Sequence, residues 1–178
     1  SDANGTETLS IETNEINHWN HIASNFHVQQ SLGDQHSLIF DYDHLYYKDN
    51  NPSYYQFSTL GKTNFVEIQK ETPITFNVFN LDYTGILSKS VQIEVGAKTT
   101  TSNFRNTIAV SALEGNEEIV DDELSSATQM DEKIHAFYTS FKFQFSEKTS
   151  LISGLRYEHT YNKLETGING NIIKRIYG

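Results

Sequence analysis

The segment FYTSFKFQFSEKTSLISGLRYEHTY, residues 137–161, contains two runs in which large apolar side chains recur at every second position. The apolar parity of these runs carries Phe137, Phe141, Phe143, Phe145, Leu151, Leu155 and Tyr157. The four residues SEKT, 146–149, separate the two runs. A period of two is the pattern of a β-strand whose two faces meet different surroundings. The segment therefore predicts an antiparallel hairpin with one apolar and one polar face.

The same alternation predicts four more strands, so that the fold is expected to be all-β, an antiparallel up-and-down meander of about six long strands. The expected strands are Trp19–Gln30, His36–Tyr47, Ile74–Tyr83, Val91–Thr101, Lys133–Phe145 and Ser150–Tyr161. Short links follow the first, third and fifth strands, and long links, Lys48–Thr72 and Ser102–Glu132, follow the second and fourth. This alternation places the tight turns at one end of the sheet and the long loops at the other.

Strands of this length, with short turns on one side and long loops on the other, are typical of a transmembrane β-barrel. In that arrangement the phenylalanine stripe faces lipid and the polar parity faces the lumen. The residues predicted to face the lumen are Asp41, Asp43, Glu94, Lys142, Arg156 and Glu158. A soluble sheet with one face on a core shows the same alternation in any single strand. A soluble barrel of the lipocalin kind would instead point the phenylalanine stripe into its cavity.

The length, the net charge and the cysteine count limit the number of domains, the kinds of partner and the kinds of metal site. The 178 residues suffice for one domain, which we expect over residues 17–178 after a disordered leader or linker at 1–16. The net charge of −10, without any run of Lys or Arg, argues against a nucleic-acid partner. The absence of cysteine excludes disulfides and thiolate metal sites.

The sequence offers little for catalysis, and we expect neither an enzyme nor a cofactor. His21 and His27 would lie about 20 Å apart on a regular strand, too far to share a metal ion. The eight acids of residues 114–132 lack the spacing of a calcium-binding loop and are expected to form a solvated loop. Asp41 and Asp43, about 7 Å apart on one face, have a spacing that a glycosidase could use, but they equally suit a polar lumen.

An aromatic cluster marks the start of the first long link. It consists of Tyr46, Tyr47, Tyr54, Tyr55 and Phe57. Aromatic residues at the end of a membrane strand form an interfacial girdle, and aromatic residues on an exposed loop can contact a ligand by stacking. We therefore treat these five residues as candidates for ligand contact.

Three segments resemble the barrel region of Bacteroidetes TonB-dependent receptors. They are FDYDHLYYKDNNPSYY at 40–55, FNLDYTGILSKSVQIEVGAKTTTSNF at 79–104 and EKIHAFYTSFKFQFSEKTSLISGLRYEHTYN at 132–162. The second resembles that family's strand ending in D-Y, short turn and strand ending in E-x-G-x-K. The third is similar to its E-x-I-x-A-x-Y strand followed by G-L-R-x-E-x-T. The three segments occur in the family's order and cover most of residues 19–161.

The resemblance implies an outer-membrane protein of a Gram-negative bacterium. Receptors of this family have a 22-stranded barrel, a plug domain and a TonB box, and they import ligands such as metal chelates or glycans. The chain shows no plug or TonB box, and six strands cannot enclose so large a lumen, so we expect an internal barrel segment of a longer protein. Its expected partners are outer-membrane lipid and the rest of the parent barrel, and in isolation the sheet would curl or pair with a second copy. The alternatives are a soluble small-ligand-binding β-barrel or extracellular binding module, and a surface adhesin.

Overall fold

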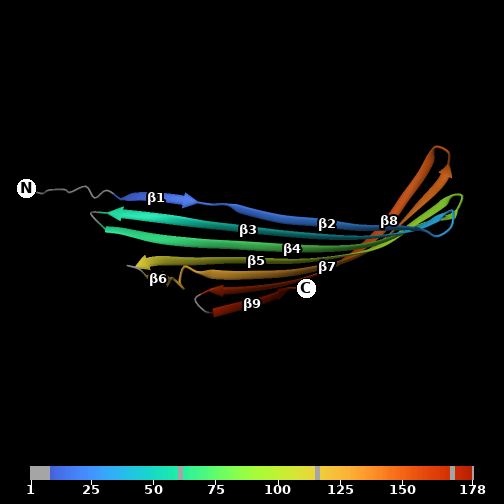
Figure 1. Ribbon diagram of the computed structural model, residues 1–178. Coiled ribbons are helices and arrows are strands. Elements are labelled where there is room, and N and C mark those ends of the chain that lie inside the picture. The colour runs from blue at the N-terminus through green and yellow to red at the C-terminus, as the bar shows by residue number, and fades with distance from the viewer. Residues whose placement is uncertain (1–8, 60–61, 115–116, 169–170, 178) are drawn as a thin grey trace, which may run out of the picture.

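A computed structural model of the chain describes residues 9–59, 62–114, 117–168 and 171–177. These residues form one antiparallel sheet of nine strands and contain no helix (Figure 1). The strands are β1 (Ser10–Glu15), β2 (His18–Ser31), β3 (His36–Thr59), β4 (Lys62–Ser88), β5 (Val91–Glu114), β6 (Glu117–Val120), β7 (Ser126–Ser146), β8 (Thr149–Ile168) and β9 (Asn171–Tyr177). The all-β antiparallel prediction is confirmed, with nine strands in place of about six.

The sheet is an open meander. Its order is β1-β3-β4-β5-β7-β8-β9, with β2 also paired to β3 and β6 also paired to β5. The short strands β1 and β2 therefore follow one another along the same neighbour, as do β6 and β7 along β5. In Figure 1 the strands run side by side for most of their length and bend upward at the end that holds the tight turns. Within the described residues the two outer edges do not meet, so the sheet does not close into a barrel.

The prediction of two long loops, at Lys48–Thr72 and Ser102–Glu132, was wrong. β3 and β4 pair without interruption from His36 opposite Gly85 to Thr59 opposite Lys62. β5 likewise stays paired to β7 as far as Ile108 opposite Ser126. The reason is that the far parts of these strands carry polar residues on both faces, so their sequence lacks a clear alternation, while neighbouring strands still satisfy their backbone groups.

Both prolines lie inside strands, at positions where they cost the sheet no hydrogen bond. Pro52 of β3 lies where β1 has ended and β2 has not begun, and its carbonyl accepts a bond from the amide of Ile16 at 3.1 Å. Pro73 of β4 coincides with a gap in the β4–β5 ladder, between Glu71 and Ile74. A proline cannot donate to a ladder, and it is accepted where a partner is missing.

The tight turns lie where they were predicted, except that β4 continues to Ser88, although a link was expected from Thr84 to Ser90. β2 connects to β3 through Leu32–Gln35, where Gly33 adopts a φ of 85°. Two-residue turns join β4 to β5 at Lys89–Ser90 and β7 to β8 at Glu147–Lys148. All three lie at one end of the sheet, as expected. Part of the expected leader differs from the prediction, because β1 pairs with β3 from Ser10 to Glu15, whereas residues 1–8 lie outside the described part.

The sheet has almost no core of its own. Among the described residues, the buried hydrophobic side chains are those of Val110 and Ala136. Many large apolar side chains stay exposed, among them Phe137 and Leu155, at 59% and 79%. No helix in the described ranges is long and apolar enough to cross a membrane. A single layer of this kind has to bury its apolar side chains against something outside the sheet.

Candidate functional site

The register of the sheet assigns every strand residue to one of two faces, because residues directly opposite each other in an antiparallel pair point the same way. One such row runs from Asp41 through Asn80, Lys98 and Ala136 to Glu158. By the same counting, all six residues predicted to face a lumen lie on a single side of the sheet. We call this side the Arg156 face and the opposite side the Phe137 face.

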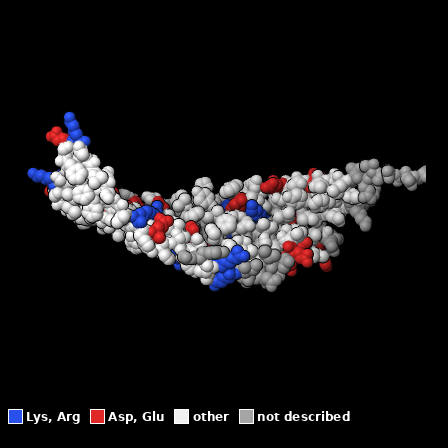
Figure 2. All heavy atoms as spheres, turned by 180° about the vertical axis from the view of Figure 1, so that it is seen from behind, with Lys and Arg blue, Asp and Glu red and all other residues white. Residues whose placement is uncertain are grey.

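The Phe137 face carries an apolar band next to the tight turns. The band spans the Phe137-face residues of 26–30 in β2, 36–42 in β3, 79–85 in β4, 91–99 in β5, 135–143 in β7 and 151–159 in β8. None of these residues is Asp, Glu, Lys or Arg. In the view of Figure 2, the visible side of the upturned end is nearly free of charged side chains except at its tips. On β5, β7 and β8 the band spans nine residues, which matches the roughly 9–11 residues that a tilted strand needs to cross a bilayer, and on β2, β3 and β4 it is shorter.

The Arg156 face over the same stretch carries linked polar side chains. Arg156 forms an ion pair with Glu158 at 2.9 Å, and its guanidinium lies 5.8 Å from the centre of the Tyr138 ring. The Tyr138 hydroxyl donates to Asp82. Towards the other edge, Asn25 donates to Asp43 at 2.6 Å, and His27 contacts Asp41 at 2.5 Å. Charged groups that satisfy one another in this way fit a wet or plugged interior and would be costly against lipid.

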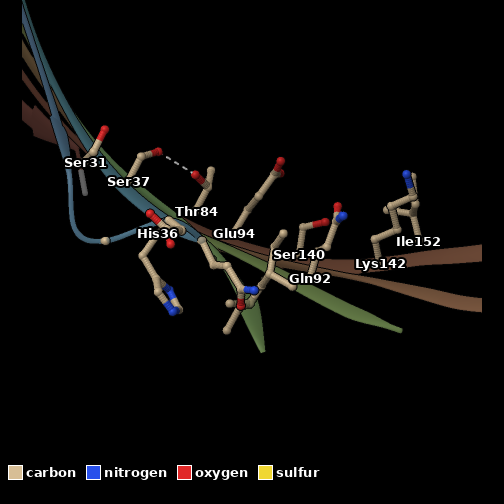
Figure 3. Close-up of a pocket in the computed structure, with 15 residues that line it drawn as sticks. Ser31, His36, Ser37, Thr84, Gln92, Glu94, Ser140, Lys142 and Ile152 are labelled. Carbon is tan, nitrogen blue, oxygen red and sulfur yellow. Dashed lines mark hydrogen bonds between the residues drawn. The ribbon is translucent and has the colours of Figure 1, made fainter. Parts of the chain in front are cut away.

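A hollow of about 450 Å³ lies at the turn end of the sheet. Its lining includes Ser37, Thr84, Glu94, Ser140 and Lys142. In Figure 3 these side chains lie on one side of the ribbon, which bends around them, and the His36 ring points the other way. The Ser37 and Thr84 hydroxyls are 2.7 Å apart. Two of the predicted lumen residues, Glu94 and Lys142, thus share one polar hollow on the Arg156 face.

The structure does not bring the five aromatic candidates together, and it places them on strand β3 where a loop was expected. Tyr47, Tyr55 and Phe57 lie on the Arg156 face, and Tyr46 and Tyr54 lie on the Phe137 face. Tyr55 and Phe57 stack with ring centres 6.3 Å apart, and Tyr47 stacks on His21 at 5.8 Å. The five residues therefore form two separate surfaces.

Tyr47 lines a second hollow on the Arg156 face, beyond the level of the apolar band, with a volume of about 410 Å³. Its lining combines aromatic, aliphatic and polar residues, namely Trp19, Tyr47, Asp49, Lys70, Thr72, Ile74, Phe104, Asn106 and Ile108. Asp49 Oδ1 and Asn51 Oδ1 are buried and accept no hydrogen bond from the described residues. Aromatic rings beside unsatisfied acceptors suit a ligand that stacks and donates hydrogen bonds.

Sequence reasoning missed Trp19, Phe104 and Asp49 as companions of Tyr47. Trp19 opposes Asp49, and Tyr47 shares a row with Ile74 and Phe104. The parity of residues 45–57 would have grouped Asp49 with Tyr47 if β3 had been extended past Tyr47, but Trp19 and Phe104 join them only through the register between strands.

Tyr54 belongs to a different hollow, of about 360 Å³, on the Phe137 face far from the turns. It lies opposite Glu67, with Phe65 and Leu113 nearby. The negative charge of Glu67 is the main cause that raises the pKa of the Tyr54 hydroxyl, and partial burial adds to it. The ligand-contact prediction for Tyr54 therefore concerns the Phe137 face, and the prediction for Tyr47 concerns the other face.

Comparison with known proteins identifies the family of the chain. A family model described as "Outer membrane protein beta-barrel family" matches residues 30–178. Among solved structures, the ferric yersiniabactin uptake receptor FyuA from Yersinia pestis matches with a TM-score of 0.43 and 11% identity, over 80% of this chain and 23% of that one. The ferric citrate transporter FecA, in its unliganded form, matches with a TM-score of 0.41 and 10% identity, over 89% of this chain and 32% of that one. The chain thus spans less than a third of either structure, and a search of curated proteins found no match.

Proposed function

We propose that this chain, which belongs to the outer membrane protein β-barrel family and is located in the outer membrane, forms part of the wall of a TonB-dependent receptor that imports a ligand. The observation that carries the proposal is the contrast between the two faces. The apolar band is uncharged and exposed, and the Arg156 face behind it carries satisfied ion pairs. A soluble ligand-binding barrel would turn the apolar side inward, away from water, and outer-membrane localisation disfavours it.

In this proposal the apolar band contacts lipid, and Asp41, Asp43, Glu94, Lys142, Arg156 and Glu158 face the lumen. The tight turns point to the periplasm, because barrels of the outer membrane keep short turns on that side. The far halves of β3, β4 and β5 then project outside the cell. These strands have 24, 27 and 24 residues, far more than the roughly 9–11 needed to cross the bilayer.

The ligand would meet the projecting part of the Arg156 face. Of the five aromatic candidates, Tyr47, Tyr55 and Phe57 lie there. Tyr47 shares its hollow with Trp19 and with the unsatisfied Asp49. A metal chelate or a glycan offers flat or hydroxylated surfaces that such residues recognise. The role is one of binding and transport, without catalysis.

Uptake by whole cells tests the proposal. Cells with and without the protein are given labelled ferric chelates and oligosaccharides, with and without an uncoupler that removes energy from the inner membrane. We expect saturable uptake of one of these compounds that needs both the protein and the energy. Uptake that persists under the uncoupler would identify a passive pore.

A pair of adjacent variants tests the ligand surface. We expect Tyr47→Ala to raise the apparent KM for uptake about tenfold, in line with about 1–3 kcal/mol for one stacked ring. Tyr46→Ala is the matched control, because the neighbouring tyrosine lies on the opposite face and should leave KM unchanged. An equal effect of both substitutions would contradict the assignment of the faces.

A further inference from the structure

Basic residues gather on the Phe137 face immediately beyond the apolar band. They are Lys48, Arg105, Lys133, Lys163 and Lys174, and we call them the cationic belt. At the same level of this face the described acidic residues are Asp131 and Glu165, with Glu71 next to Lys48. The belt is therefore positive in a chain whose net charge is −10.

The belt belongs to one face only. The residues that alternate with it on the same strands, on the Arg156 face, include Tyr47, Asp49, Phe104, Asn106, Glu132, Ile134, Asn162, Leu164 and Arg175. With Lys70, which lies on the Arg156 face next to Glu71, this set holds two cations and two carboxylates. The excess of positive charge is therefore confined to the Phe137 face, which indicates a partner that lies outside the sheet.

The carboxylates do not neutralise the whole belt. Lys48 pairs with Glu71 at 3.0 Å, and Lys163 pairs with Glu165 at 2.9 Å, with Lys174 at 3.9 Å from the same carboxylate. For Lys133 and Arg105, no carboxylate of the described residues lies within the 4.0 Å that defines an ion pair. These two side chains keep their charge available to a further anion.

Lys133 and Lys163 flank a hollow of about 390 Å³. The other Phe137-face residues of its lining are Thr75, Asn77, Thr101, Asn103, Asp131 and Tyr161. Tyr161 lies directly opposite Lys133, and Asp131 lies directly opposite Lys163, where it accepts a hydrogen bond from Asn103 at 2.5 Å. The unpaired ammonium group of Lys133, with the hydroxyl and amide donors around it, offers a site for a phosphate group attached to a hydroxylated headgroup, and the phosphate would share Lys163 with Glu165.

We propose that the cationic belt binds the phosphate groups of anionic lipid in the outer leaflet of the membrane, with Lys133 and Lys163 as its centre. The apolar band fixes the depth of the sheet in the bilayer, and the belt begins where the band ends, at the level of the headgroups. The choice of leaflet rests on the proposed function, which directs the tight turns to the periplasm. On the same face, His135 and His159 lie in the last row of the band, and His44 lies in the next row, with Lys133.

The test is a lipid titration of the full-length protein, extracted from outer membranes in a neutral detergent. The probes are diphosphorylated lipid A, uncharged phosphatidylcholine as the lipid control, and inorganic phosphate as the free-anion control. We expect lipid A to bind and the two controls not to compete with it at equal concentration. Lys133→Gln/Lys163→Gln should weaken lipid A binding at least about tenfold, because a basic residue near an anionic surface contributes about 1 kcal/mol.

The matched control is Lys98→Gln/Arg175→Gln, which removes the same charge from the Arg156 face and should leave lipid binding unchanged. The single variant Lys133→Gln breaks no ion pair and serves if the double variant does not fold. Three results would overturn the proposal. Both double variants could weaken lipid A binding equally, phosphatidylcholine could bind as tightly as lipid A, or inorganic phosphate at matching concentration could displace lipid A. Because the titration uses no transported ligand, its result stands apart from that of the uptake experiment.

Discussion

At the scale of single residues, Gly96 illustrates how the Arg156 face is packed. It lies between Asp82 on β4 and Tyr138 on β7 in one cross-strand row. A Cβ atom at this position would collide with the Tyr138 ring and with the Asp82 carboxylate. The missing side chain therefore lets the Tyr138 ring lie over the glycine and reach Asp82. An aromatic ring that covers a glycine on the next strand is a known stabilising device of β-sheets.

We expect Gly96→Val to displace Tyr138 and to lower the free energy of unfolding by about 1–3 kcal/mol, the usual cost of overpacking. Urea unfolding in detergent, followed by the change in electrophoretic mobility between folded and unfolded barrel, measures this. The matched control is Ala97→Val, whose side chain belongs to the opposite face and to the apolar band. A loss of stability in Ala97→Val as large as that in Gly96→Val would refute the packing argument.

At the scale of the elements, β7 and β8 show how far the sequence could predict the fold. The alternation of Phe137–Phe145 and Leu151–Tyr157 predicted both strands and their turn correctly, because lipid or a core must meet one side of them. The same method failed for residues 102–132, which were predicted to form a loop. Thr99–Asn103 are polar at every position, and the apolar residues beyond them, Phe104, Ile108 and Val110, have the opposite parity to Val91, Ile93 and Val95. There, pairing with neighbouring strands determines the structure, and a single strand's sequence does not contain that information.

The same limit applies to the candidate site. Tyr46 and Tyr47 are neighbours in sequence, and on a strand they must point to opposite faces. Grouping them as one aromatic cluster was reasonable for a loop and fails for β3. Trp19 joins Tyr47 only through the β2–β3 register, which pairs His21 with Tyr47 and Trp19 with Asp49.

The apolar band gives a prediction at this scale. Leu155 of β8 is 79% exposed, so in water its replacement by arginine would be nearly neutral. If the band faces lipid, Leu155→Arg should instead cost about 2–4 kcal/mol near the bilayer midplane. Folding into vesicles of defined lipid, followed by urea titration, measures the difference. Ser140→Arg on the opposite face is the control and should cost much less. Equal costs would show that only one kind of surrounding meets both faces, and a larger cost for Ser140→Arg would show that the faces have been exchanged.

At the scale of the whole molecule, the described residues form a single bent layer in which two hydrophobic side chains are buried, and such a layer lacks the interior that stabilises a soluble domain of this size. Both outer edges of the described sheet are also without a strand partner over much of their length, notably Thr149–Tyr161 of β8. An exposed edge beside an apolar surface favours association with another strand. In the arrangement that we propose, lipid would cover the band and the rest of a barrel would cover the edges.

This arrangement predicts how residues 1–178 behave when they are produced alone. In buffer without detergent, we expect the chain to form dimers or larger assemblies, since copies can cover each other's bands and edges. Detergent above its micelle concentration should disperse these assemblies while the far-ultraviolet circular dichroism keeps its β-sheet shape. Light scattering after size exclusion, with and without detergent, measures the mass of the protein component. The variant Leu151→Ser/Leu155→Ser, which removes two exposed side chains from the band, should associate less in buffer. A folded monomer of the unaltered chain in buffer alone would mean that the band is covered within the chain, and the assignment of this face to lipid would then be wrong.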